Sequence, residues 1–287
     1  MTGTSGHPQA GNVQSLRLPG AMLLLGCGKM GGAMLRGWLA RGVPGTQLFV
    51  VDTNPRDLDD VIAAGVTVVA GPADLPAGFT PAIVLLAIKP QFMDQALPDY
   101  RRFARPQTLF LSIAAGKTLA YLRQQLGDAT IVRAMPNTPA AVGRGMSVIV
   151  RQPGVSQVQL ELCAGLLSAV GEIAWVDDED LINAVTAVSG GGPAYVFLLI
   201  ECLAEAGREA GLPAELAMQL ARSTVCGSGE LARQSSESAE ALRKAVMSPK
   251  GTTEQAIAVL TAPDGLQPLM TRAIAAATRR SREIAAG

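Results

Sequence analysis

The sequence contains almost no histidine: its single copy, His7, precedes the first apolar segment. The body of the chain must therefore carry out any catalysis without imidazole. This excludes Ser–His–Asp hydrolases, histidine-ligated metal sites and dehydrogenases that use a histidine acid. The four cysteines lie far apart and form no CxxC pair, so we expect free thiols, no disulfide framework and no bound metal.

Charge is also scarce and balanced, with 17% charged residues and 24 basic against 24 acidic side chains. Zero net charge provides no basic surface for nucleic acid or acidic lipid, so we expect neither as a partner. The longest uninterrupted apolar run, residues 82–88, is too short to span a bilayer, and the polar N-terminus lacks the apolar core of a secretion signal. We expect a cytoplasmic protein with a mobile tail over residues 1–20.

Aromatic residues make up only 4%, so the core must be built from aliphatic side chains, which suits helices packed on parallel strands. Short apolar runs predict strands at residues 21–25, 48–51, 83–88, 109–113, 131–134, 147–150 and 173–176. Amphipathic segments predict helices at residues 30–40, 58–64 and 157–169. This alternation predicts an α/β fold, with a Rossmann-type parallel-sheet domain over residues 21–177.

The pattern becomes helical after residue 177, which predicts an all-α domain over residues 178–287. The expected helices cover residues 195–210, 214–235, 239–246, 253–260 and 266–286. Leu198, Leu199 and Leu203 lie on a broad apolar stripe. Such a stripe is buried either inside a closed bundle or against a second copy, and its width favours a dimerisation domain.

A glycine-rich loop lies between the first expected strand and the helix that follows it. In Gly26–x–Gly28–x–x–Gly31 the first glycine permits a tight turn, the second admits a pyrophosphate and the third lets the helix approach the strand. The predicted cofactor-binding loop consists of Gly26, Cys27, Gly28, Lys29, Met30 and Gly31. The pyrophosphate would meet free N–H groups at the helix N-terminus.

The second strand is followed by Asp52, at the usual distance for an acid that binds the adenosine ribose. Asp52 favours NADH because it repels a 2′-phosphate, whereas Asn54 and Arg56 offer groups that bind one. The sequence therefore predicts a nicotinamide cofactor, NADPH or NADH, and leaves the choice between them open.

Four motifs resemble the pyrroline-5-carboxylate reductase family: residues 87–91 (AIKPQ), 133–139 (RAMPNTP), 187–195 (AVSGGGPAY) and 248–253 (SPKGTT). The resemblance runs in order from residue 21 to residue 283. It implies reduction of 1-pyrroline-5-carboxylate, a cyclic imino acid, to L-proline by hydride transfer from NAD(P)H, the last step of proline biosynthesis. It also implies a homodimer, allows a ring of dimers, and puts the active site between the cofactor domain and the helical domains.

The resemblance assigns roles to individual residues. It implies that the cofactor's nicotinamide half is lined by Ala87, Ile88, Lys89, Pro90, Ser112 and Ala114. It implies that the substrate carboxylate meets Ser248, Gly251, Thr252 and Thr253, where free N–H groups at a helix start provide an anion site. Thr253 is the predicted catalytic residue, near the ring nitrogen; the alternative is that Thr252 or Thr253 only caps the helix.

Two positions depart from the family pattern. Gly191 replaces a serine, which should leave the backbone unchanged but removes a hydroxyl. Lys250 replaces a glycine, and a lysine is strained there if φ is positive, although its charge suits an anionic substrate. A related cyclic imine therefore remains an alternative substrate. Asn137 either braces its own loop or touches a ligand.

Two other functions compete with this interpretation. A 3-hydroxyacid dehydrogenase shares the glycine loop and a helical second domain, but it needs a lysine after the domain junction, and residues 180–199 contain none. A non-catalytic, cofactor-sensing Rossmann protein would not need the 248–253 segment.

Overall fold

The structure, a computed structural model, describes residues 16–151 and 154–286. Most of the predicted tail, with His7, lies outside the described residues. Residues 16–20 were expected to be mobile, but Leu16 and Leu18 pack against the core and the Leu16 N–H donates to the Arg41 carbonyl at 3.3 Å. Their apolar side chains attach the end of this segment to the fold.

The described chain divides into two compact units. The first ends at Val185 and also includes the end of the last helix from Ile284, and the second runs from Thr186 to Glu283. The boundary therefore lies beyond the expected residue 177. The short helix α6, Leu181–Val185, stays with the first unit because Ile182 is buried in its core.

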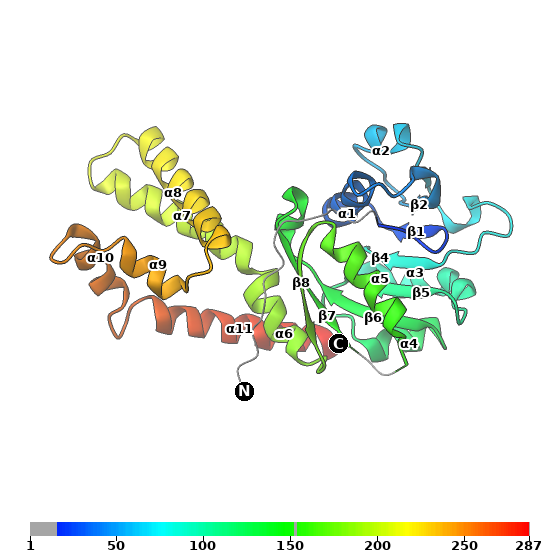
Figure 1. The fold of residues 1–287 in the computed structure, drawn as a ribbon. Helices are drawn as coiled ribbons and strands as arrows, with labels where there is room; N and C mark the ends of the chain where they lie inside the picture. Colours follow the sequence, from blue (N-terminus) through cyan, green and yellow to red (C-terminus); the bar gives the residue numbers. More distant parts are fainter. Residues whose placement is uncertain (1–15, 152–153, 287) are drawn as a thin grey trace. The chain divides into compact units, whose positions relative to one another are not determined.

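The first unit is built on one eight-stranded sheet, with strand order β3-β2-β1-β4-β5-β6-β7-β8 (Figure 1). The strands are β1 Met22–Leu25, β2 Leu48–Val51, β3 Thr67–Val69, β4 Ile83–Leu86, β5 Leu109–Ser112, β6 Thr130–Met135, β7 Gly145–Val150 and β8 Gly171–Val176. Neighbouring strands are parallel except β6 and β7, which pair antiparallel. The expected sheet was parallel throughout. The 3-10 turn Thr138–Val142 joins β6 to β7, and so short a link cannot make a parallel crossover.

Helices cover both faces of the sheet, which confirms the Rossmann-type fold. They are α1 Lys29–Ala40, α2 Asp59–Ala63, α3 Met93–Tyr100, α4 Leu119–Leu126 and α5 Gln157–Ser168. β3, α3 and α4 were not expected from the sequence. β3 has only three residues, and α3 contains Pro98, which obscures its helical pattern.

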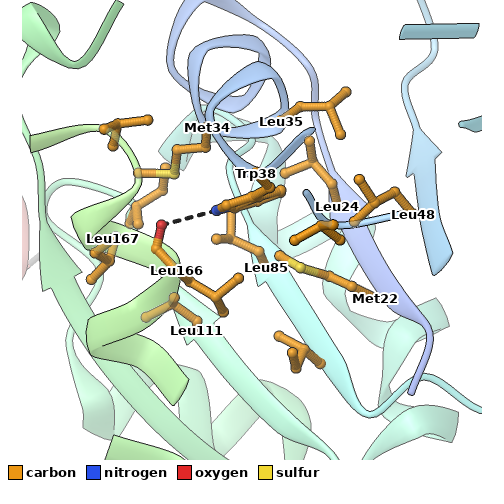
Figure 2. Close-up of a cluster of buried hydrophobic side chains, with 14 of the residues drawn as sticks. Met22, Leu24, Met34, Leu35, Trp38, Leu48, Leu85, Leu111, Leu166 and Leu167 are labelled. Atoms are coloured by element: carbon orange, nitrogen blue, oxygen red, sulfur yellow. Dashed lines mark hydrogen bonds between the residues drawn. The ribbon is translucent and has the colours of Figure 1, made fainter. Parts of the chain in front are cut away.

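Two apolar clusters form the core, one on each face of the sheet. Successive residues of a strand point to opposite faces, so Met22 and Leu24 join one cluster and Leu23 and Leu25 the other. Trp38 of α1 is fully buried, and its indole N–H donates to the Leu166 carbonyl of α5 at 2.9 Å (Figure 2). This bond ties the helix after the glycine loop to the rest of its layer.

The second unit is helical throughout. After a π-helical turn, Thr186–Gly190, it contains α7 Gly192–Glu209, α8 Ala214–Gln234, α9 Ala239–Ala245, α10 Thr252–Leu260 and α11 Leu266–Ala286. α7 and α8 lie side by side as an antiparallel pair (Figure 1). Few of its side chains are buried: Phe197, Leu198 and Leu199 of α7 are 59%, 57% and 47% exposed, so its apolar surface is not closed on itself.

Residues 181–209, which comprise α6, the π-helical turn and α7, have a mean hydropathy of 1.5 in their most apolar window. By length and composition alone this stretch is long enough and apolar enough to cross a membrane. This stretch was not expected from the sequence, because small and polar residues interrupt its apolar run.

Candidate active site

The glycine loop lies where the order of the sheet reverses. β1 is flanked by β2 and β4, so the chain leaves β1 to one side and later returns on the other. Ligands of open α/β sheets bind at such a point, beyond the carboxyl ends of the strands. The Gly26 N–H donates to the Val51 carbonyl at 2.9 Å, and the Ala87 N–H to the Leu25 carbonyl at 2.8 Å. The sheet pairing thus continues into the first residues of the site.

Backbone conformation and packing within the protein require glycine at two of the three loop positions, Gly26 and Gly31. Gly26 has φ of 88°, and a Cβ there would lie 2.8 Å from Ile88 Cγ2. A Cβ on Gly31 would overlap the Gly26 carbonyl oxygen, so only glycine lets α1 approach the end of β1 this closely.

Gly28 differs, because nothing in the protein would contact a Cβ built on it within 4 Å, and its φ of −68° suits any residue. Neither packing nor backbone conformation therefore requires glycine at this position. A pyrophosphate lying against the loop would require it. As the N-cap residue of α1, Gly28 provides no side-chain cap, which leaves the first N–H groups of α1 without one. The loop therefore fits a dinucleotide.

Asp52 follows β2 and is bonded to the glycine loop. Its Oδ2 accepts the Cys27 N–H at 2.6 Å and its Oδ1 accepts the Asn54 N–H at 2.8 Å. One carboxylate thus positions both the loop and the segment after β2, while a carboxylate has further lone pairs for a ribose hydroxyl. Burial, with a smaller contribution from Asp52, raises the pKa of the Cys27 thiol to about 11. Cys27 is therefore a protonated packing residue at neutral pH.

The residues predicted to line the nicotinamide half follow β4 and β5 at the same edge. Ser112 is the last residue of β5, in register with Leu86 of β4, and both Ser112 and Ala114 are buried. Lys89 is exposed, and Pro90 begins a 3-10 turn. Ala87 and Ile88 contact the glycine loop directly, since they are the neighbours that a Cβ on Gly26 would meet. The structure therefore brings these residues together with Gly26 in one unit.

The predicted substrate segment lies in the second unit, where Gly251 is the N-cap of α10. A Cβ on Gly251 would lie 2.9 Å from the Ser248 carbonyl oxygen, a backbone atom, and would also meet the Ser248 hydroxyl, so this position favours glycine. Thr252 and Thr253 are the first two helical residues, both are exposed, and no side chain caps this helix. The alternative that either threonine serves as the cap is therefore wrong: the cap position comes one residue earlier than expected.

Both departures from the family pattern have structural consequences. Lys250 has φ of 58°, so the strain expected for a lysine is present, and its N–H donates to Glu254 Oε2 at 2.7 Å. Gly191 has φ of −80°, a value that any residue adopts, so the backbone at this position does not require glycine, as expected. A Cβ there would lie 2.6 Å from the Tyr195 hydroxyl, which instead donates to the Ala187 carbonyl at 2.9 Å. A serine would have to displace this phenol.

Asn137 braces its own loop, because its Oδ1 accepts the Met146 N–H at 2.8 Å. Arg36 was missed by the sequence analysis. It donates to Asp60 and to the Asp57 carbonyl, next to the segment that carries Asn54 and Arg56. A single exposed arginine on a helix gives no sequence signal, because it is indistinguishable from a solvated charge.

Comparison with known proteins identifies relatives along nearly the whole chain. Residues 179–284 match the family described as "Pyrroline-5-carboxylate reductase dimerisation", and residues 22–116 match "NADP oxidoreductase coenzyme F420-dependent". A pyrroline-5-carboxylate reductase from Pseudomonas aeruginosa is 39% identical over 91% of this chain and 95% of its own length. One from Arabidopsis thaliana is 36% identical over 91% of this chain and 94% of its length.

Two solved structures of reductases from the same comparison are also similar to this chain. A pyrroline-5-carboxylate reductase from Coxiella burnetii superposes with a TM-score of 0.85 at 33% identity, covering 92% of this chain and 98% of that one. A pyrroline carboxylate reductase from Plasmodium falciparum, with NADP bound, gives a TM-score of 0.78 at 26% identity, covering 93% of this chain and 98% of that one.

The glycine loop provides a direct test of the cofactor site. Gly28→Val places a branched side chain where the protein leaves space, so the fold should survive while affinity for NADP⁺ falls by at least about 10-fold, the equivalent of one lost contact of 1.4 kcal/mol. Isothermal titration calorimetry measures the affinity. Gly31→Ala is the comparison variant: its Cβ overlaps the Gly26 carbonyl oxygen, so it should lower the melting temperature, whereas Gly28→Val should not. Unchanged affinity in Gly28→Val would exclude this loop as the pyrophosphate site.

The strain at Lys250 can be tested separately from its charge. Lys250→Gly should raise the free energy of unfolding by about 1 kcal/mol, because glycine adopts positive φ without a Cβ penalty. Lys250→Ala keeps the Cβ and should give no such gain, as urea denaturation would show. If the charge attracts an anionic substrate, both variants raise the KM alike. A lower stability of Lys250→Gly would contradict the assigned strain.

Proposed function

Since this chain belongs to the pyrroline-5-carboxylate reductase family, and reduces 1-pyrroline-5-carboxylate to L-proline with NAD(P)H, we propose which of its residues perform the reaction. The open space at Gly28, at the switch point of the sheet, supports a dinucleotide at this loop. The hydroxyacid dehydrogenase and the cofactor sensor are set aside, because relatives matching nine-tenths of the chain are named reductases of this imino acid.

The reaction transfers a hydride to the carbon of a cyclic C=N bond. A bound nicotinamide supplies the hydride, so the protein has to hold the imine, favour its protonated form and exclude water. None of these tasks needs imidazole. The substrate is small, and its one fixed charge is a carboxylate. Recognition therefore needs an anion site and one hydrogen-bonding group near the ring nitrogen.

The anion site that we propose is the start of α10. The first N–H groups of this helix have no side-chain cap, and the positive end of the helix dipole lies there. The Ser248 and Thr252 hydroxyls flank the Gly251 N-cap, and Gly251 lets Ser248 approach closely. Lys250 adds a positive charge beside the same turn. Together these groups suit a carboxylate better than they suit a neutral ligand.

Thr253 is the catalytic residue that we propose. It is the second residue of α10 and makes no capping bond, so helix capping does not account for its hydroxyl. A hydroxyl both donates and accepts hydrogen bonds, so it can bond to the ring nitrogen while the carboxylate lies against the adjacent N–H groups. In the first unit, Ala87, Ile88, Lys89, Pro90, Ser112 and Ala114 are proposed to line the nicotinamide.

For the cofactor we propose a preference for NADPH. Asn54 and Arg56 are exposed on the segment after β2, where a 2′-phosphate would project. Residues 22–116 match a family described as an NADP oxidoreductase, and the Plasmodium falciparum relative binds NADP. Asp52 already accepts two backbone N–H groups, so it has a structural role whichever cofactor binds.

The second unit is a dimerisation domain, and its exposed apolar side chains on α7 provide the surface that a second copy covers. We propose that such burial, rather than a lipid bilayer, accounts for the apolar stretch 181–209. A ring of dimers and a cytoplasmic location are further parts of this proposal.

Arg56→Ala tests the cofactor preference. Loss of a charge-assisted bond to the 2′-phosphate should raise the KM for NADPH about 10-fold and leave the KM for NADH nearly unchanged, since such a bond contributes about 1.5–3 kcal/mol. Steady-state kinetics with each cofactor measure both values. Equal changes with the two cofactors would mean that Arg56 does not recognise the phosphate.

Thr253 variants test the catalytic assignment. Thr253→Ala should lower kcat about 10- to 100-fold, because a hydrogen bond formed mainly in the transition state contributes a few kcal/mol. Thr253→Ser keeps the hydroxyl and should retain much of the activity. Since Thr253 is not a cap, neither variant should lose the roughly 1 kcal/mol of stability that a cap contributes. A Thr253→Ala enzyme with normal turnover would rule out the assignment.

A further inference from the structure

The segment between β2 and α2 is held to the glycine loop and to α1 by two separate sets of hydrogen bonds. At its start, Asp52 accepts the N–H groups of Cys27 and Asn54. At its end, the Arg36 guanidinium of α1 holds Asp60 through both carboxylate oxygens, at 2.6 and 2.8 Å. The Arg36 Nη2 also donates to the Asp57 carbonyl at 2.5 Å.

Asp57 itself adopts an unusual conformation. Its φ is 54°, a left-handed conformation that a non-glycine residue adopts only at a free-energy cost. The Asp57 carbonyl accepts from Arg36, so the arginine stabilises this conformation of a residue just before α2. Arg36 also holds the pKa of the Asp60 carboxyl below its usual value, as expected for a paired carboxylate.

Between the two anchors, Asn54 and Arg56 are exposed, and Arg56 forms no salt bridge among the described residues. From this arrangement we propose that Arg36 is a positioning residue for cofactor selectivity: by holding Asp57 and Asp60, it presents Arg56 and Asn54 to the adenosine 2′-phosphate. This rests on the proposed function, and it adds a residue that does not touch the cofactor.

The solvent exposure of Arg36 and Asp60 limits how much their salt bridge contributes to the stability of the fold. The side chains of Arg36 and Asp60 are 45% and 56% exposed, and such pairs contribute little to overall stability. Their effect should instead appear in binding. Without Arg36 the segment samples more conformations, and binding of the 2′-phosphate must order it again. NAD⁺ has no 2′-phosphate, so its binding does not require this segment to be ordered. Loss of Arg36 should therefore lower the affinity for NADP⁺ and not that for NAD⁺.

The experiment measures binding of NADP⁺ and NAD⁺ to the full-length protein by isothermal titration calorimetry, without substrate. Arg36→Ala should weaken NADP⁺ binding about 5- to 10-fold, the equivalent of ordering one backbone residue, and change NAD⁺ binding less than about 2-fold. Arg36→Lys keeps the charge but not the two-pronged geometry, so its loss should be intermediate.

Asp60→Ala separates positioning from direct recognition of the phosphate. If Arg36 acts through Asp60 and Asp57, Asp60→Ala should lower NADP⁺ affinity as Arg36→Ala does, and the double variant should be no worse than either. If Arg36 itself binds the phosphate, Asp60→Ala frees the guanidinium and NADP⁺ binds as well as before or better, which would overturn the proposal.

Arg102→Ala is the matched control. Arg102 is also exposed and also donates to a loop carbonyl, that of Pro72 at 2.6 Å, but this loop connects β3 to β4. It should leave both affinities unchanged. Equal weakening of NADP⁺ and NAD⁺ by Arg36→Ala would indicate a general structural role and refute the proposal. Since no turnover is measured, these outcomes are independent of whether pyrroline-5-carboxylate is the substrate.

Discussion

The close approach of α1 to the end of β1 is the constraint on which the site depends. Gly31 has no side chain, so the Gly26 carbonyl lies where a Cβ would otherwise be. This contact directs the N-terminus of α1 at the space above Gly28. Trp38, in the last turn of the same helix, fixes the helix through its bond to the Leu166 carbonyl. Packing at Gly31 and the hydrogen bond of Trp38 therefore hold α1 in its position at the end of the glycine loop.

The residues proposed for the reaction lie in two units with different physical roles. The sheet provides fixed backbone geometry: Asp52, Ala87 and Ser112 each lie at or just after a strand end that is in register with its neighbours. The helical unit provides a turn, Ser248–Gly251, in which a strained Lys250 and an uncapped helix start lie side by side. An enzyme with one histidine can work this way because the cofactor supplies the reducing equivalent and the protein mainly provides position.

Arg36 illustrates how selectivity can depend on residues that never touch the ligand. The residues that distinguish two cofactors are commonly sought among those that reach the phosphate. Here the segment that carries them has no secondary structure, and its conformation is determined by Asp52 at one end and by Arg36 at the other. Substitution of Asp52 or Arg36 should therefore change the discrimination between NADP⁺ and NAD⁺, although Asn54 and Arg56, the proposed phosphate-binding groups, stay the same.

The sequence alone determined the alternation of strand and helix, the glycine loop and the family, because each of these depends on local periodicity or on a contiguous motif. It did not determine that β7 runs antiparallel to β6, that α6 belongs to the first unit, or that Gly251 rather than a threonine occupies the N-cap position of α10. It also gave no sign of the pairing between Arg36 and Asp60, which are 24 residues apart. Such features depend on which segments meet in space, and only the tertiary structure, through close packing and hydrogen bonding between distant residues, decides that.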